Sequence, residues 1–237
     1  MRRIFLNKID SKYVELTGEQ HIHLSVSKRA RVGDKVEIAA GGYIYSAVVF
    51  VINKNSTTLE IVDKIEKKLE PNIEIVLYFA RQKPEHAEIT VQKCVELGIT
   101  KLVPVKTKFI CLQQSKIDRL NKIAFSAAAQ SGRGFVPKVE EEIDFEKALD
   151  EIKYYDFCIF AYENAENTSL RGFLKGKLDK KVAIFVGSEG GFSNEEVKIA
   201  VNAGLIPVSL GKRILRAETA CIAVLSCLMY EMGELGV

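Results

Sequence analysis

The 237-residue sequence contains no tryptophan, three histidines and five cysteines. No two cysteines form a C-x-x-C pair, and the histidines have no metal-binding spacing such as H-x-x-x-H. These absences argue against a zinc site, a disulfide framework or a metal cofactor. We therefore expect five reduced cysteines in the core, namely Cys94, Cys111, Cys158, Cys221 and Cys227.

Long apolar runs are also missing. No segment approaches the length of a membrane span, and the three-residue apolar stretch near the N-terminus is far shorter than a signal-peptide core. The net charge of +3, from 34 basic and 31 acidic residues, is too small to identify a nucleic-acid binder by itself. With 47% apolar residues, the composition predicts a soluble globular protein, without a membrane segment and cytoplasmic by default.

Several familiar site motifs are absent. There is no G-x-x-x-x-G-K-[ST] phosphate cradle, no G-x-S-x-G nucleophile elbow and no H-E-x-x-H zinc motif. The first strand of the expected α/β region is followed by the residues RQKPEH instead of a G-x-G-x-x-G turn. The usual nucleotide, dinucleotide and hydrolase sites are thereby excluded.

The chain divides by pattern near residues 67–72, a polar stretch that contains a proline. Residues 1–68 hold short strand-like runs and one helical piece near 19–29, which predicts a small β-barrel or sheet domain. Residues 72–237 alternate strands and helices, which predicts an α/β domain with a parallel sheet covered by helices. Its expected strands are 73–80, 101–105, 156–162, 182–186 and 206–210, and its expected helices are 84–97, 115–131, 145–152, 168–174, 194–203 and one from 217.

Two unusual loops each follow one of the last two strands: GSEGGFS at 187–193 and LGKRILRAETA at 210–220. Ligands of parallel α/β sheets bind beyond the carboxyl ends of the strands, so both loops are expected at one shared site. Gly190 and Gly191 remove side chains that would separate a ligand from the backbone amides. Ser193 and Glu196 match a capping box that opens the next helix.

Three cations, Lys212, Arg213 and Arg216, precede the last helix. The helix dipole disfavours positive charge there by about 0.3–1 kcal/mol each, so stability does not explain them. For Lys212 the better explanation is that its side chain lies over the neighbouring surface and reaches solvent. For Arg213 that explanation and contact with an anionic ligand are equally good. Arg216, between Leu215 and Ala217, fits a functional role, whereas Glu218 suits the first helical turn.

The last helix is apolar on every face between Ala220 and Tyr230, where Ser226 is the only clearly polar residue. A terminal helix of this kind must be covered on all sides. We therefore expect a homodimer.

Taken together, the two loops resemble the C-terminal motifs of the ribosomal RNA small subunit methyltransferase E family, of the SPOUT class. The resemblance extends to Q-K-x-x-E-L-G at 92–98, to Q-S-x-R at 130–133 with V-P at 136–137, and to H-x-H-L at 21–24 with Arg29 before V-G-D at 32–34. The chain departs from the family pattern at Ala129, where Glu is usual, at Ser188, where Pro is usual, and at residues 27–29, which read Ser-Lys-Arg for Val-Leu-Arg.

The resemblance implies a PUA-like RNA-binding domain before a C-terminal SPOUT domain with a deep trefoil knot. Sequence reasoning alone favours an ordinary open sheet, because threaded chains are rare. The family's cofactor, S-adenosylmethionine, would bind among the knot loops of a dimer. The residues that match its binding loops are Gly187, Glu189, Gly190, Gly191, Leu210, Gly211, Ile214 and Leu215.

The implied reaction is methylation of uracil N3 in the decoding region of 16S ribosomal RNA, with the assembled small subunit as the expected substrate. Arg216 would stabilise the uracil anion and Glu218 would be the base that removes its proton. Phosphates would be held by Arg2, Arg3, Arg29, Arg31, Lys83 and Arg133. Two alternatives remain: a SPOUT methyltransferase acting on another RNA such as tRNA, and a non-catalytic RNA-binding factor in ribosome assembly.

Overall fold

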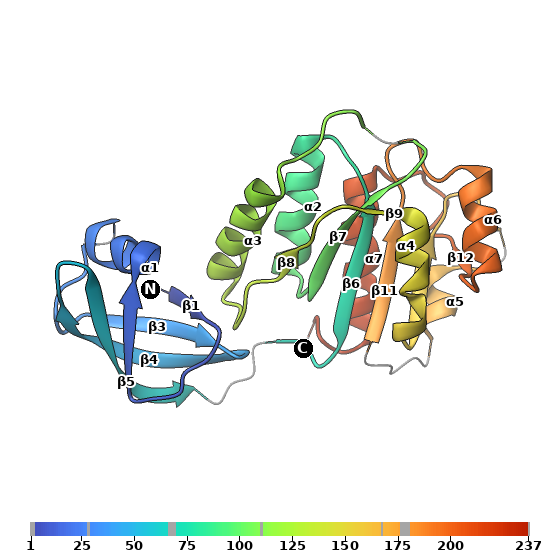
Figure 1. The fold of residues 1–237 in the computed structure, drawn as a ribbon. Helices are drawn as coiled ribbons and strands as arrows, with labels where there is room; N and C mark the ends of the chain where they lie inside the picture. The colour runs from blue at the N-terminus through green and yellow to red at the C-terminus, as the bar shows by residue number, and fades with distance from the viewer. Residues whose placement is uncertain are drawn as a thin grey trace. The chain divides into compact units, whose positions relative to one another are not determined.

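The computed structural model divides the chain into two compact units, Met1–Glu70 with Ala128–Val136, and Pro71–Ala127 with Pro137–Val237. The first unit therefore includes a short segment from the middle of the chain as well as the N-terminal region. The structure describes residues 3–27, 29–65, 70–109, 111–166, 168–175 and 181–236. Figure 1 shows the elements of both units.

The first unit is built on a five-stranded sheet in the order β1-β3-β4-β5-β2, in which β1 and β3 are parallel and the other pairs antiparallel. Alternating side chains point inward, so Leu16, Val36, Ile38, Val49 and Leu59 form a fully buried core. Its strands are β1 (Arg3–Leu6), β2 (Tyr13–Thr17), β3 (Lys35–Ala40), β4 (Tyr43–Ile52) and β5 (Ser56–Ile65).

The helix expected near 19–29 is shorter and irregular. It consists of α1 (Gly18–Ile22) followed by one π-helical turn, η1 (His23–Ser27). His21 is buried there, with Nδ1 2.8 Å from Thr57 Oγ1, as a packing residue of this unit. The strand β2 was not expected, because its sequence YVELT holds few of the alternating apolar residues that mark strands.

The second unit contains a parallel sheet in the order β12-β10-β11-β6-β7-β8, with β9 also paired to β7. This confirms the expected α/β architecture. The strands are β6 (Glu74–Ala80), β7 (Lys101–Lys106), β8 (Lys138–Val139), β9 (Ile143–Asp144), β10 (Phe157–Ala161), β11 (Lys181–Val186) and β12 (Pro207–Val208).

Helices cover this sheet on two faces. On one face, Val76, Tyr78 and Phe185 form a buried cluster with residues of α4 and α6. α7 packs against α2 and against β11 (Figure 1). The helices are α2 (Pro84–Glu96), α3 (Ile117–Ser131), α4 (Phe145–Asp150), the 3-10 turn η2 (Ile152–Tyr154), α5 (Leu170–Leu174), α6 (Asn194–Asn202) and α7 (Ala217–Glu231).

Most of the sequence patterns that predicted where a helix begins or ends are confirmed. The capping box of α6 is confirmed: Ser193 Oγ accepts from Glu196 N at 3.3 Å, and Glu196 Oε2 accepts from Ser193 N at 2.8 Å. Gly98, which ends the α2 segment, has a φ of +101°. The helix expected from Ser115 begins two residues later, at Ile117.

The cysteine expectation needs correction. Cys94 and Cys221 are buried, but Cys111 and Cys158 are only partly buried and Cys227 is exposed. Cys227 lies on the face of α7 that this single chain does not cover, so its apolar sequence context did not mean burial. Within the described part of the chain, no helix is long and apolar enough to cross a membrane.

Candidate functional site

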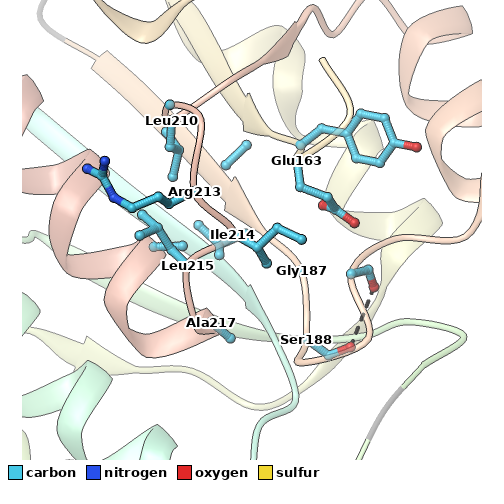
Figure 2. Close-up of a pocket in the computed structure, with 14 residues that line it drawn as sticks. Glu163, Gly187, Ser188, Leu210, Arg213, Ile214, Leu215 and Ala217 are labelled. Atoms are coloured by element: carbon cyan, nitrogen blue, oxygen red, sulfur yellow. Dashed lines mark hydrogen bonds between the residues drawn. The ribbon is translucent and has the colours of Figure 1, made fainter. Parts of the chain in front are cut away.

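An open cleft lies beyond the carboxyl ends of β10 and β11, where both glycine-containing loops meet (Figure 2). The sequence predicted this convergence, because parallel strands end at the same edge of a sheet. The lining residues are Ala161, Tyr162, Glu163, Val186, Gly187, Ser188, Gly191, Leu210, Gly211, Arg213, Ile214, Leu215, Ala217 and Ala220.

The first loop is a tight turn closed by its own backbone. Gly191 N donates to Ser188 O at 2.9 Å, and the Ser188 hydroxyl donates to Phe109 O of the neighbouring segment. Gly191 has a φ of +70°, and a Cβ built on Gly187 would lie 3.0 Å from Gly191 C. Glycine at these positions is thus required by the turn, and Ser188 anchors the turn through its hydrogen bond to Phe109.

Glu163, which sequence reasoning missed, stands at the rim of the same cleft. It lies two positions after the last residue of β10, Ala161, and a Cβ on Gly191 would lie 2.6 Å from its Oε1. Its position just after a parallel strand was the available signal, because such positions gather at the ligand-binding edge. Glu163 is exposed and therefore free to turn toward a ligand.

The second loop supplies the opposite side of the cleft. Leu210, Gly211, Ile214 and Leu215 all line it, as the sequence predicted, and Arg213 joins them. Figure 2 shows this segment along one side and Glu163 with Ser188 along the other. Ile214 is 86% exposed, an unusual state for a large aliphatic side chain beside a cleft. The site thus offers apolar surface, a carboxylate and backbone at close range.

Two of the predicted cofactor residues point elsewhere. Neither Glu189 nor Gly190 is among the residues that line the cleft. The Glu189 carboxylate instead accepts from Lys83 N at 3.3 Å and lies 2.9 Å from His86 Nδ1, at the start of α2. Burial would raise the pKa of Glu189, but the hydrogen bonds from His86 and from backbone amides outweigh it and hold the pKa below its ordinary value.

The two predicted catalytic residues lie where α7 begins. Arg216 is the exposed N-cap residue of α7, and its side chain makes no capping hydrogen bond. Glu218 is 8% exposed, and its Oε2 accepts no hydrogen bond from the described residues. That oxygen lies 3.7 Å from His86 Nδ1. Sequence reasoning did not assign His86 any role.

The predicted RNA-binding residues fall into two groups. Arg29, Arg31 and Lys83 are exposed, and Arg29 has a left-handed φ of +49°. Arg3 and Arg133 are instead held by carboxylates: Arg3 Nη2 lies 2.6 Å from Glu37 Oε2, and Arg133 Nε lies 3.1 Å from Glu70 Oε2. Arg2 lies outside the described residues.

Arg133 has a mainly structural setting. Its side chain is 5% exposed and its guanidinium lies 4.7 Å from the centre of the Phe135 ring. Gly134 N donates to the same Glu70 carboxylate at 2.6 Å. A buried guanidinium that is paired in this way stabilises the fold of the first unit and does not present its charge to RNA. In the described ranges, no group of three His, Cys, Asp or Glu side chains could hold a metal ion.

Comparison with known proteins identifies relatives along most of the chain. A family model described as an RNA methyltransferase domain matches residues 69–229. Ribosomal RNA small subunit methyltransferase E of Mesomycoplasma hyopneumoniae is 30% identical, covering 95% of this chain and 98% of the relative. The protein of that name from Buchnera aphidicola (subsp. Schizaphis graminum) is 32% identical over 87% of this chain and 86% of its own.

A solved structure supports the fold over the full length. The ribosomal RNA small subunit methyltransferase E from Neisseria gonorrhoeae, crystallised with S-adenosyl methionine, has a TM-score of 0.85 and 29% identity. The match covers 97% of each chain.

Proposed function

Because this chain belongs to the ribosomal RNA small subunit methyltransferase E family, we propose that it methylates uracil N3 of one uridine in 16S ribosomal RNA, with S-adenosylmethionine as methyl donor. The observation that carries the proposal is the cleft at the ends of β10 and β11, formed by the two loops that also carry the family motifs. The decoding region of the small subunit is the proposed location of the uridine.

The cleft fits the proposed cofactor. Its apolar side chains, such as Ile214 and Leu215, suit an adenine ring, and Glu163 suits a cationic group. The turn at Gly187 and Gly191 leaves no room for side chains, so a ligand there meets backbone. When bound, S-adenosylmethionine supplies an electrophilic sulfonium methyl group, whose C–S bond breaks as the methyl bonds to nitrogen and leaves a neutral thioether.

The residues at the start of α7 would act on the base. Uracil N3 carries a proton and is a poor nucleophile until that proton leaves. Glu218 has an unbonded carboxylate oxygen that can accept the proton, and Arg216 is an exposed cation that can stabilise the negative charge developing on the uracil oxygens. Arg216 follows Leu215 and Glu218 follows Ala217, and both Leu215 and Ala217 line the cleft. The methyl donor and the uracil would therefore be held close together.

We further propose that the C-terminal unit carries the trefoil knot of SPOUT proteins. The chain pairs Ser209 with the 168–170 segment, where Ser209 N donates to Thr168 O and Leu170 N donates to Ser209 O. It then returns from the edge strand β12 to place α7 against β11 and α2. Such a return is what threading of the final segment requires.

A homodimer is proposed from the same helices. Tyr230 of α7 is 68% exposed and Ile89 of the adjacent α2 is 42% exposed, and Cys227 is exposed as well. A second copy would cover this apolar surface. The first unit is proposed to be the PUA-like RNA-binding domain, with exposed Arg29 and Arg31 as phosphate contacts; Lys83 is the corresponding candidate of the second unit.

Methyl transfer to defined RNAs tests the proposal. The protein is incubated with methyl-labelled S-adenosylmethionine and with one of three substrates: unmodified small ribosomal subunits, protein-free 16S RNA, or total tRNA. Label in small subunits is the expected result. Label in tRNA alone would favour the alternative RNA substrate, and cofactor binding with transfer to none of them would favour a non-catalytic assembly factor.

A further inference from the structure

His86, Glu189 and Glu218 form a polar cluster, and Glu189 and Glu218 each follow a residue that lines the cleft. His86 belongs to the first turn of α2, Glu189 follows Ser188 of the first loop, and Glu218 follows Ala217 at the start of α7. His86 Nδ1 lies 2.9 Å from Glu189 Oε1 and 3.7 Å from Glu218 Oε2. One imidazole nitrogen therefore lies near two carboxylates, but within hydrogen-bonding distance of Glu189 only.

Glu218 is the unusual member. It is 8% exposed, yet its Oε2 receives no hydrogen bond from the described residues. A buried carboxylate oxygen without a donor is unfavourable, because the water it gave up on folding has not been replaced. Nδ1 makes its short contact with Glu189, so the acceptor capacity of Glu218 is left over for another donor. An N–H group of a bound ligand would donate the hydrogen bond that Glu218 Oε2 lacks.

The surroundings of the cluster leave few other groups that could take up a proton. Cys221, one turn along α7 from Glu218, has its pKa raised to about 12 by burial, so its thiol stays protonated near neutrality. On the α2 side, Thr90 Oγ1 donates to Gln82 Oε1 at 2.8 Å, and Gln82 Nε2 lies 3.8 Å from Cys221 Sγ. Glu189 stays ionised because its pKa is held below the ordinary value. Among the residues that the structure describes, the charged groups within 4 Å of the His86 imidazole are thus Glu189 and Glu218.

We propose that His86 is a positioning residue for methyl transfer, which holds the carboxylate of Glu218 ready to accept the N–H proton of the target base. This inference rests on the proposed function. In the step it supports, the N3 proton of uracil passes to Glu218 Oε2. The electron pair left on N3 would form the new bond to the methyl carbon while the bond from that carbon to sulfur breaks and its electron pair stays on sulfur. The short contact with Glu189 orients the imidazole, and the 3.7 Å separation leaves Glu218 Oε2 open to another donor.

Three variants separate this role from a purely structural one. His86→Ala removes the imidazole, His86→Gln keeps a hydrogen-bond donor that does not titrate, and Glu85→Gln alters an exposed residue of the same helical turn as a control. For each, one measures kcat for methylation of small subunits from pH 5.5 to 8.5, the affinity for S-adenosylmethionine by calorimetry, and the thermal unfolding midpoint.

The expected result is a fall in kcat of at least ~30-fold for His86→Ala, because general-base catalysis contributes about 10²–10⁴-fold and the base is still present but misplaced. Cofactor affinity should change less than about twofold, since His86 is not part of the cleft lining. His86→Gln, which keeps a hydrogen-bond donor at this position, should have a kcat between those of His86→Ala and wild type. The Glu85→Gln control should follow wild type throughout.

Two results would overturn the inference. If His86→Ala and His86→Gln keep the wild-type kcat and its pH profile while binding the cofactor normally, His86 does not position the proton acceptor. If wild type binds S-adenosylmethionine but transfers methyl to no RNA, the proposed function fails, and the role of His86 fails with it. The cofactor affinity and the unfolding midpoint show whether a loss of kcat is local or follows from misfolding.

Discussion

Four arginines, two in each unit, stand in opposite surroundings. In the first unit, Arg133 is buried and paired with Glu70, and Arg3 is paired with Glu37. In the second unit, Arg213 and Arg216 are exposed beside the cleft, and the described residues offer them no ion pair. The same residue type therefore holds a fold together in one place and offers charge to a ligand in the other. The groups that an arginine contacts in the fold, and not its neighbours in the sequence, decide which of the two roles it has.

The glycines on either side of Arg133 show why the sequence context of an arginine does not reveal its role. Gly132 and Gly134 flank Arg133, a pattern that predicts the close approach of another backbone. Gly134 does clear space, because a Cβ there would lie 2.6 Å from the backbone of Gly42, but the close neighbour belongs to the protein itself. At Gly191 the neighbour is Glu163 of the cleft rim. A glycine in the sequence thus predicts that another group lies close to its backbone. It does not predict whether that group belongs to the protein or to a ligand.

The largest effect is expected for Arg133→Ala. Removing one partner of a buried ion pair leaves Glu70 charged and unpaired, which costs about 3–5 kcal/mol of unfolding free energy. Denaturant unfolding measures this, with exposed Arg31→Ala as the matched control, expected within about 0.5 kcal/mol of wild type. Unchanged stability together with weaker RNA binding would instead place Arg133 on the RNA-binding surface.

Arg216→Ala tests the other side of the comparison. We expect it to bind S-adenosylmethionine as wild type does and to transfer methyl about 10²–10³-fold more slowly, the usual cost of losing one group that stabilises a developing negative charge. Single-turnover rates and calorimetric affinities separate the two quantities. Lys212→Ala, in the same loop, is the control and should retain most activity. Normal turnover by Arg216→Ala would remove Arg216 from the mechanism.

Gly191→Ala should weaken cofactor binding by at least ~10-fold, because the added Cβ meets Glu163 and the φ of +70° strains any side chain, a cost of about 1–3 kcal/mol. Gly204→Ala is a matched control, with a φ of +99° and open space around its Cβ. It should lose similar stability yet bind the cofactor normally. Equal affinities for both variants would mean that the Gly191 turn does not shape the binding site.

The smallest effect concerns pH and Glu189. Its folded-state pKa lies below the ordinary value of 4.5, so its ionised form stabilises the fold above that pH, and this contribution is lost as the pH falls through the lowered pKa. Wild type should therefore lose more stability than Glu189→Gln on going from pH 6 to below pH 4. Parallel losses in unfolding experiments would show that the contacts with His86 and Lys83 do not stabilise the fold.

Sequence reasoning succeeded where the determinants are local. The capping box of Ser193 and Glu196 spans three residues, and both loops lie directly after buried strands, so helix start and cleft could be predicted. It failed where partners are distant. Arg133 and Glu70 are 63 positions apart, and His86 and Glu189 are 103 apart. The short strands β8 and β9 have two residues each, too few to show any periodicity.

The central claim is that the cleft of the second unit serves methylation of uracil N3, and identification of the product nucleoside tests it most directly. Small subunits that lack the modification are treated with methyl-labelled S-adenosylmethionine and the protein, with Gly191→Ala as a parallel sample. The RNA is digested and its nucleosides are separated and weighed by mass spectrometry. Labelled 3-methyluridine from wild type, and much less from Gly191→Ala, is the predicted result. Label on a ribose oxygen, on carbon 5 of a pyrimidine or on a purine would contradict the account.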